Sequence, residues 1–153
     1  MSRIVLEIAV AALVCLASGL RAADAKPAVK EHVHLHGPFS ACAKACAQCM
    51  LACDSCHHHC ERLVAEGKKD HVKTMRLCND CGAICAVAAQ LASRDGPLSV
   101  TLCDACAKAC DTCGAACKKF EDEHMQACAK ACAACAKACR DMIEHAGHQG
   151  ESK

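Results

Sequence analysis

The spacing of the cysteines constrains this chain more than any other feature. The stretch from Cys128 to Cys139 reads CAKACAACAKAC, in which four cysteines follow one another at intervals of four, three and four residues. Residues three and four apart lie next to each other on one face of an α-helix. Intervals of three and four recur in four separate stretches, so we predict that these thiols line the inner faces of helices. They are Cys42, Cys46, Cys49, Cys53, Cys56, Cys60, Cys78, Cys81, Cys85, Cys103, Cys106, Cys110, Cys113, Cys117, Cys128, Cys132, Cys135 and Cys139.

Four helical segments are predicted, over residues 38–66, 70–94, 97–119 and 121–146. Pro38 suits a first helical position, and Gly67 suits the position just after a helix end. Short links favour antiparallel neighbours. The predicted fold is therefore all-α, an antiparallel up-down-up-down four-helix bundle with a Cys-lined core. The chain has no Trp or Tyr and only two Phe, so thiols must fill much of that core.

The N-terminus has the pattern of a secretion signal. Arg3 gives a positive start, Ile8 to Leu20 form an apolar run, and Ala23 to Ala25 fit a cleavage site of the A-x-A type. The run is too short to span a bilayer, so we expect an exported, periplasmic protein that leaves the membrane once the signal is cleaved. The predicted divisions are a signal peptide at 1–25, a flexible His-containing leader at 26–37, the bundle at 38–146 and a disordered tail at 147–153.

Charge and motifs exclude several function classes. The formal net charge is +1 with histidines neutral, which gives nucleic-acid binding no electrostatic support. The sequence contains no nucleophile–base pair and no open metal site that spacing would single out. We therefore predict a protein that is not an enzyme and does not bind nucleic acid.

Two ordinary explanations of many cysteines fit this pattern poorly. Disulfide scaffolds staple separate elements, whereas here successive cysteines share one regular helix. Buried cysteine can act as a small hydrophobe, but that explains one or two positions. A disulfide-stapled helical protein or a thiol redox buffer remains an alternative. A redox protein needs accessible thiols of low pKa at helix starts, whereas these thiols run through whole helices.

Metal binding is the remaining explanation, and softness points to Cu(I), Zn(II) or iron–sulfur clusters. Zinc requires closed sets of four ligands, and a continuous ladder of thiols has no such grouping. Four thiolates around Zn(II) also leave two buried negative charges, whereas one Cu(I) per thiolate is neutral. Charge neutrality predicts a capacity near one copper per cysteine, roughly 18 per mature chain. A zinc or mixed-metal thiolate reservoir remains the alternative.

The strips CAKACAQCMLACDSCHHHC, CNDCGAICAVA and EDEHMQACAKACAACAKACRDM, with the turn DGP, resemble the bacterial copper storage proteins. The resemblance implies a four-helix bundle that stores many Cu(I) ions and assembles as a homotetramer. It also implies either supply of copper to enzymes or detoxification, with copper chaperones or copper enzymes as partners besides copper itself. The signal sequence places this chain with the exported members of the family.

Copper must reach the interior through one end of the bundle. The first turns of the second and fourth helices should meet at the same end, which brings His71 and Met75 close to His124 and Met125. Imidazole and thioether bind Cu(I) more weakly than thiolate, which suits the transfer of an ion inward. We predict that these four residues form the copper entrance, the alternative being that they only pack or face solvent.

Two further regions are candidates, the opposite end of the bundle and a run of three histidines. The opposite end lies near Phe39, Leu98 and Met142, and we expect it to be an apolar plug. The run His57–His59 lies beside two of the cysteines. Such tracts can bind divalent metal, although histidines on a solvated surface are the more common case.

Overall fold

The structure is a computed structural model that describes residues 37–150. It contains the α-helices α2 (Pro38–Ala65), α3 (Val72–Ala92), α4 (Ser99–Cys117) and α5 (Glu123–Gly150), with a short 3₁₀ helix η1 (Lys69–His71) before α3. No strand occurs within residues 37–150. The predicted signal peptide and nearly all of the predicted leader lie outside the described residues.

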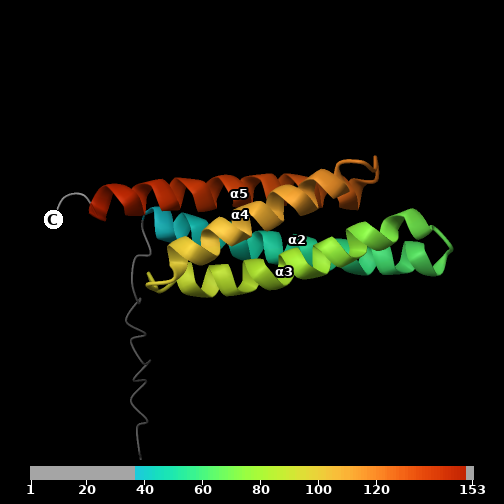
Figure 1. Ribbon diagram of the computed structural model, residues 1–153. Helices are drawn as coiled ribbons and strands as arrows, with labels where there is room; N and C mark the ends of the chain where they lie inside the picture. Colours follow the sequence, from blue (N-terminus) through green and yellow to red (C-terminus); the bar gives the residue numbers. More distant parts are fainter. Residues whose placement is uncertain (1–36, 151–153) are drawn as a thin grey trace, which may run out of the picture. The chain divides into compact units, whose positions relative to one another are not determined.

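The four α-helices form an antiparallel bundle in up-down-up-down order (Figure 1). Helix α2 packs against α3 and α5, and α4 packs against the same two helices, so α2 and α4 lie diagonally across the bundle. Cysteine contacts give the direction of each helix: Cys42 near the start of α2 meets Cys103 near the start of α4 and Cys139 late in α5. The predicted all-α bundle is confirmed.

Turns that need a left-handed residue end two of the helices. Gly67 has φ of 91°, its N–H donates to the Val64 carbonyl, and the next N–H reaches the Leu63 carbonyl. This pair of bonds is the Schellman pattern that closes a helix. After α3 the same pattern places Asp95 at φ of 50° and bonds the Gly96 N–H to the Leu91 carbonyl.

The helix bounds lie within two residues of the predicted ones except at the end of α5, and two of the differences have a clear local cause. Helix α4 begins at Ser99 rather than at 97, because the Ser99 N–H donates to the Gly96 carbonyl in a turn that precedes the helix. Helix α5 continues to Gly150 instead of ending at Ala146. The reason is that Gly147 does not adopt the positive φ of Gly67, and glycine stops a helix only where the chain turns.

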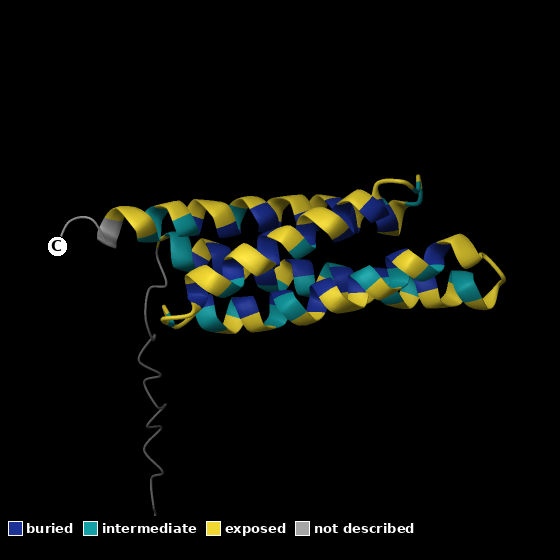
Figure 2. Cartoon of the chain, in the orientation of Figure 1, coloured by how far each residue is buried: buried dark blue, intermediate teal, exposed yellow. Residues whose placement is uncertain are grey.

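The interior of the bundle is made of small side chains. Figure 2 shows the buried positions as stripes on the facing sides of the helices. Cysteines and alanines dominate these stripes, with Met125 and Met142 as the largest fully buried side chains. Phe39 and Phe120 only pack against the edge of this core. Among the described helices, none combines the length and apolarity that a membrane crossing requires.

Candidate metal centre

All of the cysteines in the described region face the core of the bundle. Each of the eighteen is free rather than disulfide-bonded, and none exposes more than 1% of its surface. Their spacing of three and four residues keeps them on the inner face along the full length of each helix. The predicted Cys-lined core is therefore confirmed, and sequestered thiols line the bundle axis.

Thiol contacts run along the axis as a network. The Sγ–Sγ distances within it are 3.5–4.0 Å, from 3.5 Å between Cys42 and Cys103 to 4.0 Å between Cys81 and Cys85. Such contacts join thirteen thiols: Cys42, Cys46, Cys49, Cys53, Cys81, Cys85, Cys103, Cys106, Cys110, Cys128, Cys132, Cys135 and Cys139. An ion bound anywhere in the network thus has further sulfur atoms within reach.

The remaining five thiols lie toward the end of the bundle where α3 and α5 begin. Cys78 Sγ lies 3.7 Å from Cys113 Sγ and 3.8 Å from Cys117 Sγ. Cys56 and Cys60 instead contact the thioether of Met125. Sulfur ligands therefore continue to this end of the bundle, where a methionine replaces a cysteine as neighbour.

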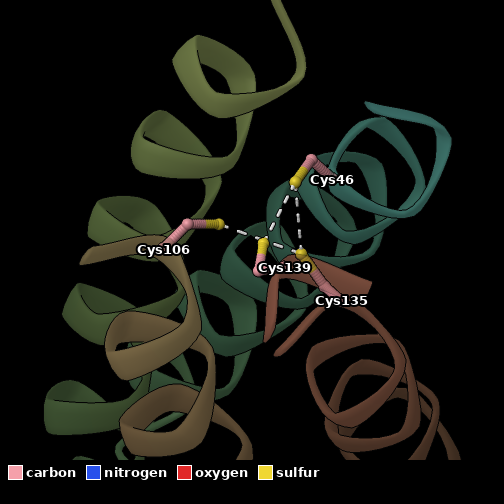
Figure 3. Close-up of side chains that lie close together, drawn as sticks. All are labelled: Cys46, Cys106, Cys135 and Cys139. Atoms are coloured by element: carbon pink, nitrogen blue, oxygen red, sulfur yellow. Dashed lines mark hydrogen bonds between the residues drawn. The ribbon is translucent and has the colours of Figure 1, made fainter. Parts of the chain in front are cut away.

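The thiols also gather into sets of four, which corrects one of our predictions. In each set the four Sγ atoms lie within 4.8 Å of one another. Figure 3 shows one set, with Cys46 from α2, Cys106 from α4, and Cys135 and Cys139 from α5. The expectation that the ladder has no closed group of four is wrong, because it considered each helix alone, whereas neighbouring helices contribute thiols at the same level.

The sets overlap, and this limits how many tetrahedral ions they can hold. Cys49 belongs to two of the sets, and so does Cys135. A thiol cannot complete two separate tetrahedral sites without bridging them, so zinc in closed sites would leave part of the network unused. Cu(I), which accepts fewer thiolates per ion, suits a network of shared sulfurs better.

Burial and hydrogen bonding set the protonation of the thiols. Burial raises the pKa of Cys60 to about 11. Within the network the shifts go both ways: a hydrogen bond from Cys110 lowers the pKa of Cys49 to about 6, whereas hydrogen bonds with Cys103 and Cys106 raise that of Cys46. Hydrogen bonds between neighbouring thiols therefore separate their pKa values, so that some keep a proton while others ionise first.

The structure places the four predicted entrance residues at one end, but at different depths. Met125 is fully buried, and its Sδ lies 3.4 Å from Cys56 Sγ. His71 is buried and stacks on Phe120 with ring centroids 4.1 Å apart, and its Nδ1 has no hydrogen-bond partner. Met75 is half-buried, and His124 has 52% of its side chain exposed.

The opposite end is apolar only in part. Met142 is fully buried there, together with Ala88 and Ala92 of α3. Phe39 packs against the core, but 63% of Leu98 is exposed. The predicted plug is therefore right for the methionine and wrong for Leu98, because α4 begins only after this residue and its side chain lies outside the packed interior.

Sequence reasoning missed the role of Asp122 at the same end as the entrance residues. Its Oδ1 accepts the backbone N–H groups of His124 and Met125, which caps α5, and its Oδ2 lies 3.0 Å from Nε2 of His59. Although burial opposes the shift, the Met125 N–H and the His59 ring lower the pKa of Asp122. Asp122 directly precedes α5, which begins at Glu123, and Asp is a common N-cap residue; the predicted start at 121 placed it inside the helix and hid this role.

Comparison with known proteins places the chain among copper-binding bundles. The family model for copper storage proteins matches residues 35–144. The chain is 41% identical over 87 residues to the uncharacterized cysteine-rich protein YhjQ of Bacillus subtilis (strain 168), covering 56% of this chain and 78% of that protein.

Two solved structures have similar folds. The Cu(I)-bound copper storage protein BsCsp3 has a TM-score of 0.62 and 37% identity, with 70% of this chain and 99% of that chain covered. A cytosolic copper storage protein from Streptomyces lividans, loaded with five coppers, has a TM-score of 0.64 and 27% identity, with coverages of 70% and 92%. The chain therefore belongs to the copper storage protein family.

Proposed function

We propose that this chain stores Cu(I) inside its bundle, bound to cysteine thiolates at about one copper per thiolate. The observation that carries this proposal is the network of buried, free thiols with Sγ–Sγ distances of 3.5–4.0 Å along the axis. Soft thiolates select Cu(I), and a Cu(I) thiolate unit is neutral, which suits an interior where uncompensated charge is costly. The Cu(I)-bound state of the related BsCsp3 supports the same cargo.

The experiment that tests storage is a titration of the reduced protein with Cu(I) under anaerobic conditions, against a competing chelator. We expect saturation near the number of buried thiols, with thiolate-to-copper charge-transfer absorption rising until that point. Saturation at roughly three or four ions would instead match closed tetrathiolate sites and would favour the zinc reservoir. A parallel titration with Zn(II) followed by Cu(I) should show zinc displaced.

The proposed role is storage rather than catalysis. The stored copper would either serve copper enzymes, directly or through copper chaperones, or be held away from the cell's other ligands. Deleting the gene and measuring both copper tolerance and the activity of copper enzymes separates these two uses. Loss of tolerance alone supports detoxification, and loss of enzyme activity at low copper supports supply.

Copper is proposed to enter at the end where α3 and α5 begin. His124 is the most exposed of the four residues, Met75 is half-buried, and His71 and Met125 lie inside. This gradation, from an exposed imidazole to a thioether 3.4 Å from a thiol, is the order of ligands that would pass an ion from solvent to the thiol network. Imidazole and thioether hold Cu(I) less tightly than thiolate, so the final transfer onto the thiols is downhill.

Export to the periplasm is a further part of the proposal, and it rests on the signal pattern within residues 1–25. Expression of the full chain should yield a periplasmic protein whose N-terminus begins after Ala25. Recovery of the protein from the cytosol with an intact N-terminus would contradict export. It would also align this chain with the cytosolic relative from Streptomyces lividans.

We also propose a homotetramer, on the strength of family membership. Exposed apolar side chains on the bundle surface, Leu51 at 64% and Leu98 at 63% exposure, support burial of part of that surface between copies. Light scattering coupled to size-exclusion chromatography should give a mass four times that of the mature chain. A mass equal to one chain would contradict the assembly.

A further inference from the structure

The ring of His57 has a fixed hydrogen-bonding arrangement on the outside of the thiol core. Its Nδ1 lies 3.0 Å from the backbone carbonyl oxygen of Met75. A carbonyl oxygen only accepts hydrogen bonds, so Nδ1 must carry the proton. In the neutral ring, Nε2 then carries a lone pair and no proton.

That lone pair faces a carboxylate. Nε2 of His57 lies 3.5 Å from Oε1 of Glu61, one helical turn further along α2. The other carboxylate oxygen, Oε2, lies 3.3 Å from Nδ1 of His58. Spacings of three and four residues place the glutamate between the two imidazoles. A proton on either imidazole makes these contacts ion pairs or hydrogen bonds, and a divalent ion that displaces such a proton would find both imidazoles and the carboxylate already close together.

The distances suit a transition-metal ion. Nitrogen and oxygen ligands lie about 2.0–2.2 Å from zinc, and in a tetrahedral arrangement such ligands are about 3.4 Å apart. The observed separations of 3.5 Å and 3.3 Å match this value. Metal-bound histidines usually donate their other N–H to a carbonyl or carboxylate, and His57 makes such a bond to Met75.

Solvent can reach this group, in contrast to the thiols. The exposed fractions of the side chains are 28% for His57, 74% for His58 and 52% for Glu61. The third histidine of the run is not available as a ligand, because Nε2 of His59 bonds Asp122 and its Nδ1 accepts from Arg62. The run therefore divides into two ligands and one structural residue.

We propose that His57, His58 and Glu61 form a second metal site on the surface of α2, which binds a divalent ion such as Zn(II) or Cu(II). Imidazole and carboxylate ligands favour these ions, whereas Cu(I) prefers the thiolates. The site is separate from Cu(I) storage, although the Met75 carbonyl links it to the proposed entrance. A chain with both sites would bind copper in either oxidation state.

The test uses the full mature protein saturated with Cu(I), so that its thiolates are occupied, and titrates it with Zn(II) against a fluorescent zinc indicator. Histidines in the leader also bind zinc, so the measured quantity is the difference between variants. We expect His57→Gln and Glu61→Gln to lose one zinc equivalent relative to the wild type. Loss of a direct ligand should weaken binding at least as much as the ~10-fold loss caused by removing an outer partner.

His59→Gln is the matched control, because glutamine can still donate to Asp122, and it should retain the zinc equivalent. His58→Gln, at a largely exposed position, should weaken zinc binding without disturbing the fold, and unchanged Cu(I) capacity confirms that the bundle is intact. Equal zinc binding by Glu61→Gln and the wild type would overturn the proposal. So would loss of the same equivalent in His59→Gln. Failure of Cu(I) storage would appear separately, in the Cu(I) titration.

Discussion

The Sδ atom of Met125 lies 3.4 Å from the Sγ atom of Cys56, which makes this methionine the link between the proposed entrance and the thiols. It lies 4.0 Å from Cys60 Sγ as well. A copper ion bound to the Met125 thioether would therefore lie next to two thiols. Transfer to the thiols would then require only small movements of side chains.

Replacing Met75 and Met125 by Leu should slow Cu(I) uptake without lowering capacity. Leu has nearly the volume of Met, so the packing cost stays below ~1.5 kcal/mol for each change, while the thioether ligands are lost. Stopped-flow absorption of the copper–thiolate bands measures the rate, and the titration endpoint measures capacity.

Met142→Leu is the control for this comparison. Met142 is as completely buried as Met125 but lies at the opposite end of the bundle, so its replacement should leave the uptake rate unchanged. Uptake by the Met75 and Met125 double variant at the wild-type rate would contradict the proposed entrance. Equal slowing in Met142→Leu would show that the effect arises from packing.

His71→Phe should stabilise the metal-free protein. Nδ1 of His71 is buried without a hydrogen-bond partner, and such a group costs about 1–3 kcal/mol. Phe removes this cost and keeps the stacking contact with Phe120. We expect the free energy of unfolding in urea, measured in reductant, to rise by about 1 kcal/mol, since the larger ring offsets part of the gain.

The same substitution should slow copper uptake if His71 is a ligand at the entrance. For the stability measurement, His71→Gln serves as the comparison. The buried amide of glutamine also needs hydrogen-bond partners, so this substitution should not stabilise the fold. A Phe variant that unfolds more easily than the wild type would mean that Nδ1 is satisfied in solution, and the expected gain would be wrong.

Much of this structure follows from the period of the cysteines. Intervals of three and four residues fix one face of each helix, and for this reason the burial of positions as far apart as Cys42 and Cys139 could be predicted. The left-handed backbone conformation of Gly67 was also predictable, since a helix commonly ends on glycine where the chain turns back. These features depend on residues close together in the sequence.

The features that sequence reasoning missed depend on how the helices align. Sets of four thiols, such as the one with Cys46 and Cys106, arise only when separate helices place cysteines at the same level. The bond from His57 to the Met75 carbonyl joins two helices in the same way. Gly147 was misjudged because glycine permits a turn but does not require one.

Loading with Cu(I) should release clearly less than one proton per copper near pH 7, because hydrogen bonds between thiols lower the pKa of several of them, Cys49, Cys81, Cys103, Cys106, Cys117, Cys128 and Cys135. Burial raises the pKa of Cys60 to about 11, so this thiol is protonated and must lose its proton to bind. Hydrogen bonds from Cys110 and Cys113 lower the pKa of Cys49 to about 6 and that of Cys117 to about 5. These two sites have little proton to release. A pH-stat titration in weak buffer measures the ratio.

The same shifts set the direction of the pH effects. Copper competes with protons, so binding at a protonated thiol should weaken about tenfold for each unit of falling pH. In the metal-free protein, the raised pKa of Cys60 means that the folded state keeps a proton which the unfolded chain loses above pH 9. The contribution of the Cys60 thiol to the stability of the folded state is therefore fully present below pH 9 and decreases as the pH rises toward 11. Proton release near zero would show that the thiols are already ionised.

Gly114→Ala should destabilise the bundle, although alanine normally stabilises a helix by about 0.5–1 kcal/mol relative to glycine. A Cβ atom at Gly114 would lie 3.1 Å from Cys132 Cβ, across the interface between α4 and α5. That atom is attached directly to the backbone, so relief requires the two helices to separate and disturbs a thiol of the network. We expect a lower free energy of unfolding and weaker Cu(I) binding in competition with a chelator.

Gly147→Ala is the matched control. This glycine is also helical, and a Cβ atom there would have no neighbour within 4 Å, so only the gain in helix propensity remains. Urea unfolding should therefore separate the two substitutions by sign, with Gly147→Ala at or above the wild type and Gly114→Ala below it. Equal stabilisation by both would mean that α4 and α5 can move apart freely, and that the thiol positions at this level are less fixed than their contacts indicate.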